Sequence, residues 1–188
     1  MGDAHAGDLH FRALTDKSLA DLFTLMEGHR IFASCACMKC RLRPDRFDPL
    51  SPRQRREALR ACVHQGSAVG VLAYDHDAPV AWCSVAPRKN YAALSASRSL
   101  APLDDAEVWS VSCFWVKPAL RRRGVASALL RAAVDYARSQ GARIVEGYPV
   151  SQGHPDHRMG SAGIFRRAGF RDVTPPGRRR TIMRNVLG

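Results

Sequence analysis

The sequence predicts an α/β (α+β) fold built as one domain over residues 1–188. Extended and helical patterns alternate along the chain, and Glu107–Val116 is apolar on both faces, as expected of a strand at the centre of a sheet. A hydrophobic share of 46% in 188 residues is enough for one core. The chain shows no internal repeat and no long linker. We expect residues 9–187 to be structured and residues 1–7 to be flexible.

The first elements are a short strand and a helix. Leu9–Leu14 alternates apolar and polar residues, which predicts a strand. Thr15 or Asp16 then provides an N-cap for a helix that carries apolar residues at helical spacing and ends at Gly28. The following segment, 29–50, contains prolines and a cysteine cluster, and we expect it to be irregular.

A second helix and a hairpin follow. Ser51–Pro52 combines an N-cap serine with a proline at the first helical position, and the helix is expected to stop at Gly66. Ala68–Tyr74 and Pro79–Val85 are rich in strand-forming residues and are separated by a short polar turn. This pattern predicts a β-hairpin.

The centre of the chain carries the strongest signals. We expect a short helix at Tyr91–Leu100 and then the central strand, which is rich in β-branched and aromatic residues. Apolar residues recur at helical spacing over Val125–Ala137, and Gly141 stands where a C-terminal glycine ends a helix. Ala142–Tyr148 then predicts another strand.

The C-terminal part is expected to hold a loop, a helix and a hairpin. Pro149–Met159 contains glycine, proline and two histidines and is predicted to be a loop. A short helix should span about Gly160–Ala168 and end at Gly169. Phe170–Val173 and Thr181–Val186 then read as two strands joined by a Pro-Pro-Gly turn.

The net charge of +12 points to a polyanionic partner. Only Lys17, Lys39, Lys89 and Lys117 are lysines, and the other basic residues are arginines, which bind phosphate through a planar, two-pronged group. Codon bias is an alternative cause of this excess. No apolar run reaches the roughly 18 residues of a membrane span, and the N-terminus has no secretory pattern. We expect a soluble cytoplasmic protein with no membrane partner.

Six cysteines in a reducing compartment are expected to be thiols. Cys35, Cys37 and Cys40 form a cluster, but a metal site would need a fourth ligand at suitable spacing. We therefore predict no metal site. The cluster is expected either to line a pocket or to pack under the second helix, with redox pairing as a weaker alternative.

The segment that joins the central strand to the clear helix is the main candidate site. Arg121, Arg122 and Arg123 precede Gly124 at a helix start, where backbone N–H groups and the positive end of the helix dipole attract an anion. Pyrophosphate suits such a site, and Gly124 and Ala126 leave room for its close approach. The segment is not a P-loop, because no Lys-Ser/Thr pair follows the glycine. A solvated arginine turn is the plainer alternative.

These residues resemble the GCN5-related N-acetyltransferase (GNAT) superfamily. Its signature, an arginine or glutamine followed by x-x-Gly-x-Gly/Ala after a strand ending in Val-x-Pro, is matched by Val116-Lys117-Pro118 and by Arg121-x-x-Gly124-x-Ala126. The run Ile164–Phe170 is similar to a second family motif, Leu-Tyr-x-x-x-Gly-Phe. The order of elements agrees over almost the whole chain.

The resemblance implies a mixed central sheet flanked by helices, with two strands that splay in a V to admit an acyl-CoA. It implies acetyl-CoA as co-substrate, with the pyrophosphate on the amides of residues 121–127, the pantetheine along the end of the central strand, and the thioester oxygen near the N–H of Val116. The implied donor-binding residues are Phe114, Trp115, Val116, Arg121, Arg122, Arg123, Gly124, Val125, Ala126, Ser127 and Phe165.

Two positions depart from the family pattern. The usual tyrosine acid is replaced by Phe165, and the usual glutamate base on the central strand is replaced by Ser110. Water can carry the proton instead, so transfer remains compatible with the sequence. Glu146 and Tyr148 are the catalytic candidates that we retain with Val116, although an ion pair for Glu146 and aromatic packing for Tyr148 are plain alternatives. Further substitutes are Cys113, His154 and His157, the two histidines being more simply explained as solvated loop residues.

The leading function is acetyl-CoA-dependent N-acetylation of a primary amine on a small metabolite or antibiotic-like molecule. The alternatives are acetylation of a macromolecule (a protein amine or aminoacyl-tRNA) and a non-catalytic module that binds CoA or nucleic acid. In such an architecture residues 29–43 and 87–90 should lie near the acceptor pocket. The sequence leaves open the acceptor, a nucleic-acid partner and a homodimer.

Overall fold

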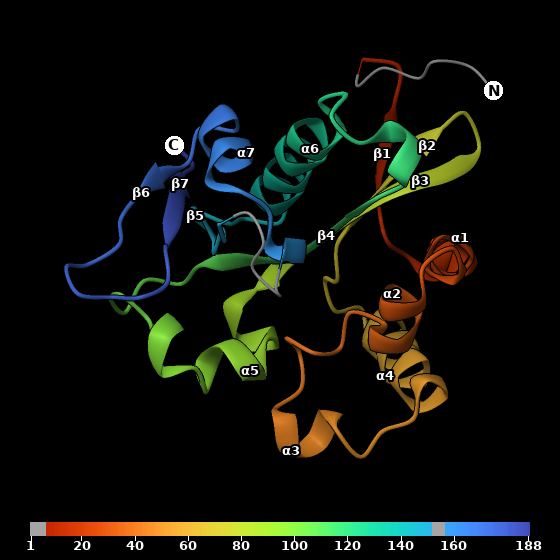
Figure 1. Ribbon diagram of the computed structural model, residues 1–188, viewed down its shortest axis with the longest axis horizontal. Helices are drawn as coiled ribbons and strands as arrows, with labels where there is room; N and C mark the ends of the chain where they lie inside the picture. Colours follow the sequence, from red (N-terminus) through yellow and green to blue (C-terminus); the bar gives the residue numbers. More distant parts are fainter. Residues whose placement is uncertain (1–6, 152–156) are drawn as a thin grey trace.

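The computed structural model describes residues 7–151 and 157–188, so the expected flexible segment 1–7 lies, apart from Gly7, outside the described residues. The chain forms a seven-stranded sheet in the order β1-β2-β3-β4-β5-β7-β6 (Figure 1). Neighbouring strands are antiparallel except for β4 and β5, which are parallel. The strands are β1 (His10–Ala13), β2 (Val71–Asp75), β3 (Ala78–Pro87), β4 (Trp109–Val116), β5 (Ile144–Gly147), β6 (Arg171–Asp172) and β7 (Met183–Val186). The predicted mixed sheet, with its central strand at β4, is confirmed.

Helices cover both faces of this sheet. One face packs against α6 and α7, and the other packs against α1, α2 and α4 (Figure 1). The helices are α1 (Leu19–Glu27), α2 (Arg30–Cys35), α3 (Pro44–Phe47), α4 (Pro52–His64), α5 (Ala92–Ser95), α6 (Val125–Ser139) and α7 (Ala162–Arg167). No helix in the described part of the chain is long and apolar enough to cross a bilayer.

Helix α4 begins as its sequence predicts. The Ser51 hydroxyl accepts a hydrogen bond from the Gln54 amide at 3.3 Å, and the Ser51 amide donates to the Gln54 side chain at 2.8 Å. This reciprocal capping satisfies two amides that have no acceptor within the helix, while Pro52 occupies a position that needs no donor.

The expectation that residues 29–50 are irregular is wrong in part, because they contain α2 and α3. The His29 ring accepts from the amide of Phe32 at 3.4 Å and so caps α2, and Phe32, 1% exposed, anchors this short helix in the core. Ala36 and Cys37 then adopt left-handed backbone angles, φ 46° and 55°, which end the helix and reverse the chain. Because α2 buries one side chain and α3 buries none, neither helix has an apolar periodicity that the sequence could reveal.

The segment predicted as one helix at Tyr91–Leu100 is instead α5 followed by a separate 3₁₀ turn at Arg98–Leu100. The amides of Ala92 and Ala93 donate to the carbonyls of Arg41 and Cys40, so this segment is fastened to the chain that follows α2. Because these two amides donate to a distant segment of the chain, the region does not form one longer helix.

Strands β4 and β5 separate after a short stretch of pairing. β4 pairs with β3 along its whole length, from Trp109 to Val116, but pairs with β5 only from Trp109 to Val111. Beyond Val111 the edge of β4 that faced β5 therefore lacks a strand partner among the described residues. The V-shaped opening implied by the family resemblance is confirmed.

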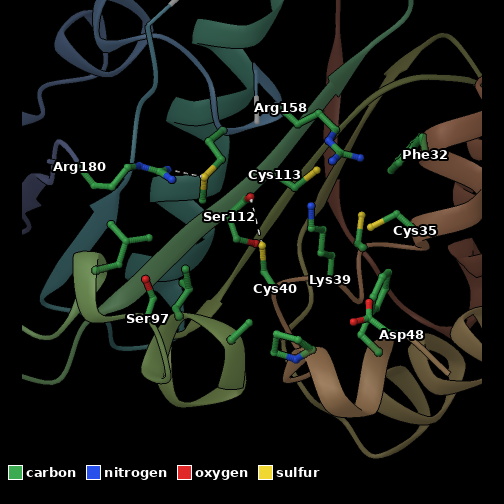
Figure 2. A pocket seen from close by; sticks show the side chains of 17 residues that line it. Phe32, Cys35, Lys39, Cys40, Asp48, Ser97, Ser112, Cys113, Arg158 and Arg180 are labelled. Atoms are coloured by element: carbon green, nitrogen blue, oxygen red, sulfur yellow. Dashed lines mark hydrogen bonds between the residues drawn. The ribbon is translucent and has the colours of Figure 1, made fainter. Parts of the chain in front are cut away.

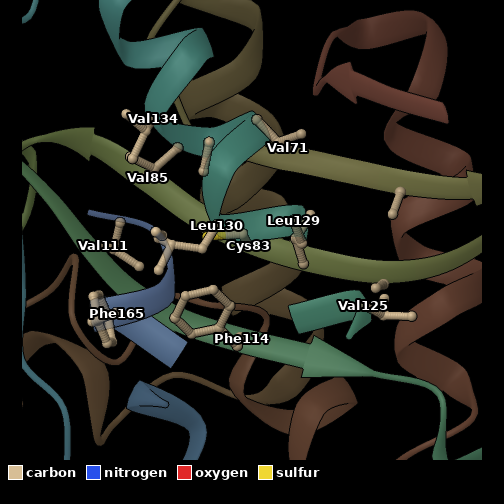
Figure 3. Packing of buried hydrophobic residues seen from close by; sticks show 14 of the residues in the cluster. Val71, Cys83, Val85, Val111, Phe114, Val125, Leu129, Leu130, Val134 and Phe165 are labelled. Atoms are coloured by element: carbon tan, nitrogen blue, oxygen red, sulfur yellow. The ribbon is translucent and has the colours of Figure 1, made fainter. Parts of the chain in front are cut away.

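A close contact between β5 and α7 sets the far side of this opening. Phe165 packs directly on Gly147, and its ring meets Phe114 and Phe170 edge to face, with centroids 5.9 Å and 5.0 Å away (Figure 3). A Cβ built on Gly147 would lie 1.9 Å from the Phe165 ring, so only glycine lets α7 approach the strand this closely. Gly147 and Phe165 thus fix the position of α7 over the sheet.

Replacing Gly147 with alanine is expected to lower the free energy of unfolding by about 1–3 kcal/mol, because the added methyl overpacks the Phe165 contact. Urea denaturation measures the change. The control is Gly28→Ala at the end of α1, where φ is −66° and the nearest atom to a new Cβ is 3.7 Å away. Equal stability of Gly147→Ala and wild type would contradict the packing role of Gly147.

Candidate active site

The arginine-rich loop ends where α6 begins, next to the open end of β4. Gly124 caps α6 with φ 79°, and its carbonyl accepts from the amides of Ser127 and Ala128. The amides of Val125 and Ala126, in the first turn, have no acceptor within the helix. Because they lie at the positive end of a 15-residue helix, they favour an anion.

The same loop is tied to the end of β4. Arg121 donates from its Nε to the carbonyl oxygen of Val116 at 3.1 Å. The next amide along, that of Lys117, donates to Val80 on the β3 side. Because successive amides of a strand point in opposite directions, the Val116 N–H faces the open edge of β4. The predicted hydrogen-bond donor at Val116 is therefore placed in the opening between β4 and β5.

A cavity of about 520 Å³, which we call the donor cavity, occupies this opening. Nine of the eleven predicted donor-binding residues line it, whereas Arg123 does not and Phe165 lies buried beneath it. The lining also includes residues that sequence reasoning missed, namely His29, Ile31, Leu120, Arg158, Gly160, Ser161, Ile164 and Arg167. Most of these come from α2 and from the segment around α7, which meet β4 only in the folded chain.

The donor cavity has the chemistry that coenzyme A requires. Arg121, Arg122 and Arg167 supply positive charge for phosphates beside the first turn of α6. Along the apolar floor, the buried indole N–H of Trp115 has no acceptor in the described part of the chain. An amide-containing arm would find this donor and the open edge of β4 side by side. The residues present therefore fit an acyl-CoA.

A second cavity of about 240 Å³, which we call the acceptor cavity, is bordered by Arg158 as well (Figure 2). Arg158 lines both cavities, so they meet at its side chain. The acceptor cavity is lined by Phe32, Cys35, Cys37, Lys39, Cys40, Pro44, Phe47, Asp48, Ala93, Leu94, Ser97, Leu100, Ser112, Cys113, Arg158, Met159 and Arg180. Residues 29–43 contribute to this lining as expected, whereas residues 87–90 do not; residues from the segment 93–100 line it instead.

The cysteine cluster borders this cavity and also packs against the core. Cys37 is buried, and its sulfur accepts from the Trp82 indole at 3.1 Å. Burial raises the pKa of the Cys35 and Cys37 thiols. Cys113 differs, because a hydrogen bond from Cys37, aided by the charge of Arg158, lowers the pKa of its thiol despite burial. Within residues 7–151 and 157–188 no group of side chains is arranged to hold a metal ion.

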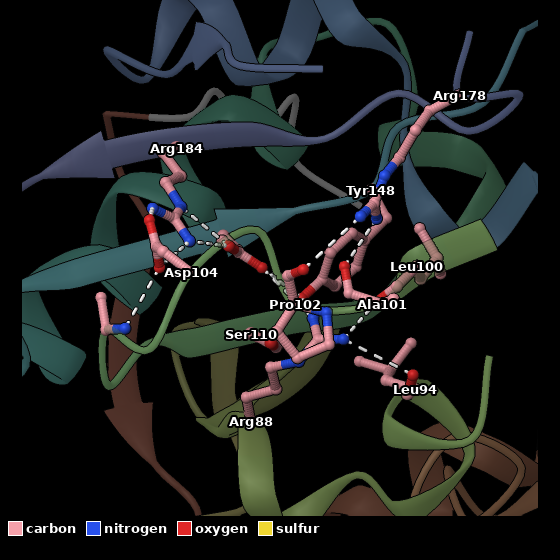
Figure 4. A network of polar contacts seen from close by, with 12 residues as sticks. Arg88, Leu94, Leu100, Ala101, Pro102, Asp104, Ser110, Tyr148, Arg178 and Arg184 are labelled. Atoms are coloured by element: carbon pink, nitrogen blue, oxygen red, sulfur yellow. Dashed lines mark hydrogen bonds and ion pairs between the residues drawn. The ribbon is translucent and has the colours of Figure 1, made fainter. Parts of the chain in front are cut away.

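Glu146 and Tyr148, the two side chains predicted to carry a proton, lie in a buried polar network outside both cavity linings (Figure 4). One Glu146 oxygen accepts from Arg184 at 2.8 Å, and the other accepts from Arg88 at 3.2 Å and from the Tyr148 hydroxyl at 2.8 Å. Burial and the Glu146 charge raise the pKa of Tyr148 well above its usual range. These contacts account for both residues as structural elements of the sheet.

Arg88 connects this network to the acceptor cavity. Its guanidinium binds Glu146 and Tyr148 and also donates to the carbonyls of Leu94 and Leu100, two residues of the cavity wall. The sequence gives no sign of this role of Arg88, because its partners are as much as 60 residues away along the chain. Ser110, at the position of the usual glutamate, is buried within the same network and bonds the Tyr148 hydroxyl at 2.7 Å.

Two further candidates lie outside the described side chains. His154 lies outside the described residues, as does the side chain of His157.

Comparisons with known proteins agree with this geometry. The acetyltransferase (GNAT) family model matches residues 37–170. Among solved structures, the chain is similar to the polyamine N-acetyltransferase of Drosophila melanogaster, which forms N-acetylagmatine (16% identity, TM-score 0.62, 96% of this chain and 100% of that one). It is also similar to the PaiA N-acetyltransferase of Thermoplasma acidophilum in complex with coenzyme A (12%, 0.55, 95% and 99%). A third is the ribosomal-protein-alanine N-acetyltransferase of Brucella melitensis (16%, 0.54, 95% and 99%). No curated protein matches the chain in sequence.

Replacing Glu146 with glutamine is expected to destabilise the fold by roughly 3–5 kcal/mol, because two arginines would lose their buried carboxylate. Tyr148→Phe, which removes one hydroxyl and keeps the ring, should cost about 1–3 kcal/mol. Urea denaturation at neutral pH measures both values. Full stability of Glu146→Gln together with a loss of turnover would restore Glu146 as a proton carrier.

Proposed function

Because this chain belongs to the acetyltransferase (GNAT) family, we propose that it is an acetyl-CoA-dependent N-acetyltransferase that acts on a primary amine of a small molecule. The observation that carries the proposal is the joining of two cavities at Arg158, one suited to a CoA and the other small and mainly apolar. A protein that only binds CoA would not need the second cavity. The similar Drosophila and Thermoplasma proteins, named for small-amine acetylation and for a coenzyme A complex, support the same assignment.

The donor would lie across the end of β4. The pyrophosphate would accept from the amides at the start of α6, with Arg121 and Arg122 neutralising its charge. The pantetheine would extend along the unpaired edge of β4, and the Val116 N–H would face the thioester oxygen. Acetyl-CoA supplies an activated acyl group, so a neutral amine held nearby can attack without covalent help from the protein.

Cys113 is the wall residue that we propose as proton acceptor. It lies on β4 and lines the acceptor cavity, and its pKa is lowered whereas those of Cys35 and Cys37 are raised. A Cys113 thiolate would take one proton from the bound ammonium and later release it to solvent. The second proton of the amine would pass to the departing CoA thiolate. This scheme needs neither Glu146 nor Tyr148.

A macromolecular acceptor is the second candidate. Arg30, Arg53, Arg56 and Arg60 gather around an open hollow between α2 and α4, which would suit an acidic surface, and a ribosomal-protein acetyltransferase is among the similar structures. However, Arg56 and Arg60 are paired with Glu27 and Glu57, at 3.2 Å and 2.6 Å. The hollow also lies apart from the lining of the acceptor cavity. We therefore favour the small amine.

Replacing Gly124 with alanine is expected to weaken acetyl-CoA binding by about tenfold or more, because a side chain would stand where the anion approaches the helix amides. Gly177→Ala is a matched control, since Gly177 has the same φ of 79° and open space around it. Calorimetry with acetyl-CoA and a CoA-release assay with small primary amines measure the outcome. Equal affinity in Gly124→Ala and wild type would overturn the donor site, and CoA release with macromolecules alone would overturn the small-amine acceptor.

Cys113→Ser is expected to reduce kcat about 100-fold, as loss of a general base does. Thiolate is the active form, so the wild-type rate should rise with pH through a thiol pKa below the usual value, and the variant should lose that step. The pH profile of kcat measures this, with Cys62→Ser outside the two cavity linings as control. An unchanged profile would remove Cys113 from the mechanism.

A further inference from the structure

The acceptor cavity combines apolar walls with positive charge. Phe32 and Phe47 provide aromatic surface, and leucine, methionine and cysteine side chains complete the walls. The charged residues of the lining are Lys39, Asp48, Arg158 and Arg180. Lys39 and Asp48 are exposed, whereas Arg158 and Arg180 are half-buried. The charges of Lys39 and Asp48 cancel in the sum over the lining, so the net positive charge of the lining equals that of the two guanidinium groups.

Arg158 differs from the two arginines of the Glu146 network. Arg88 and Arg184 are each held by the Glu146 carboxylate, and Arg184 also binds Asp104. Arg158 forms no ion pair with a carboxylate in the part of the chain that the structure describes. In Figure 2 its guanidinium points into the space bordered by Cys113, Cys35 and Phe32. A half-buried guanidinium in an apolar setting favours a bound anion, because its charge is poorly solvated there.

We infer that the acceptor is a primary amine that also carries an anionic oxygen group, a carboxylate or a phosphate, on an apolar body; this rests on the proposed function. The anionic group would pair with Arg158, with the charge of Arg180 nearby, and the apolar body would lie against Phe32 and Phe47. A planar guanidinium binds either kind of anion through two parallel hydrogen bonds. The ammonium would then lie toward β4, beside Cys113.

The same lining argues against a polycation. Polyamines are held by carboxylates, and Asp48, on the exposed rim, is the carboxylate among the lining residues. A second ammonium in the interior would meet Arg158 and Arg180 at close range, and like charges in a partly desolvated site repel. The positive charge of the cavity, like its small volume, thus disfavours amines that carry a second positive charge.

The test compares acceptors that differ only in the anionic group. The pairs are phenylalanine with 2-phenylethylamine and 2-aminoethyl phosphate with ethanolamine, and spermidine is the polycation. In a CoA-release assay the anionic member of at least one pair should have a kcat/KM about tenfold higher than its partner, as expected for one charge-assisted pair. The pair that shows the preference tells carboxylate from phosphate. A kcat/KM of the anionic member that is no higher than that of its partner in both pairs, or preference for spermidine, would overturn the inference.

Two variants assign the preference to Arg158. Arg158→Gln should raise KM for the anionic acceptor about tenfold, while KM for the partner amine and the Kd of acetyl-CoA change by less than about threefold. Arg167→Gln is the matched control, because Arg167 lines the donor cavity but not the acceptor cavity; it should weaken acetyl-CoA and leave acceptor KM unchanged. If Arg158→Gln weakens acetyl-CoA as much as the acceptor, Arg158 belongs to the donor and the inference is wrong.

A binding measurement separates this inference from the proposed function. 3-Phenylpropanoate has the apolar body and the carboxylate but no amine, so it cannot be acetylated. Calorimetric binding of this probe to the full chain that is lost in Arg158→Gln would support the anion site even if no amine is acetylated. Equal binding to wild type and Arg158→Gln would overturn the anion site whatever the outcome of the transfer assay.

Discussion

The Glu146 carboxylate, buried between two arginines, is the interaction on which the rest of this architecture depends. Removing a carboxylate and two guanidinium groups from water is costly unless their polar atoms have partners. Both Glu146 oxygens accept hydrogen bonds, whereas the buried Nε of Arg88 has no partner in the described residues. The network joins β5, β7 and the segment after β3 at the closed end of the V. Beyond this point β4 and β5 part, and the donor cavity occupies the opening between them.

The alternation of side chains along β4 then divides the two sides of the site. Phe114 and Val116 face the cluster that includes α6, and they lie on the floor of the donor cavity. Cys113 and Trp115 pack with the helices of the other face; Cys113 lines the acceptor cavity, whereas the Trp115 ring borders the donor cavity. Because successive side chains of a strand point to opposite faces, one short strand presents different chemistry to donor and acceptor. No separate domain is needed to hold the acceptor.

Local signals predict the segment that lines the donor cavity, whereas contacts between distant residues are hidden in the sequence. Residues 121–127, which line that cavity except for Arg123, stand out because a helix start, its glycine and its arginines are neighbours in the chain. The partners of Glu146 could not be predicted, because Arg88 and Arg184 are 58 and 38 residues away along the chain. The acceptor wall formed by α2 and α5 depends on left-handed residues and on backbone bonds between distant segments. Such features leave no periodic pattern in the sequence.

The arginines around β4 fall into three groups, which differ in the chemical groups that surround each guanidinium. Arg88 and Arg184 form ion pairs with the buried Glu146 carboxylate, which gives them a structural role. Arg121 and Arg122 line the donor cavity beside the first turn of α6, where helix amides and side chains would share an anion. Arg158 has no carboxylate partner in the described residues; it borders both cavities, and its charge lowers the pKa of the Cys113 thiol. In the proposed reaction this guanidinium would stabilise anionic groups on the acceptor side of β4. On the two proposals, part of the net charge of +12 serves small anionic ligands on both sides of β4.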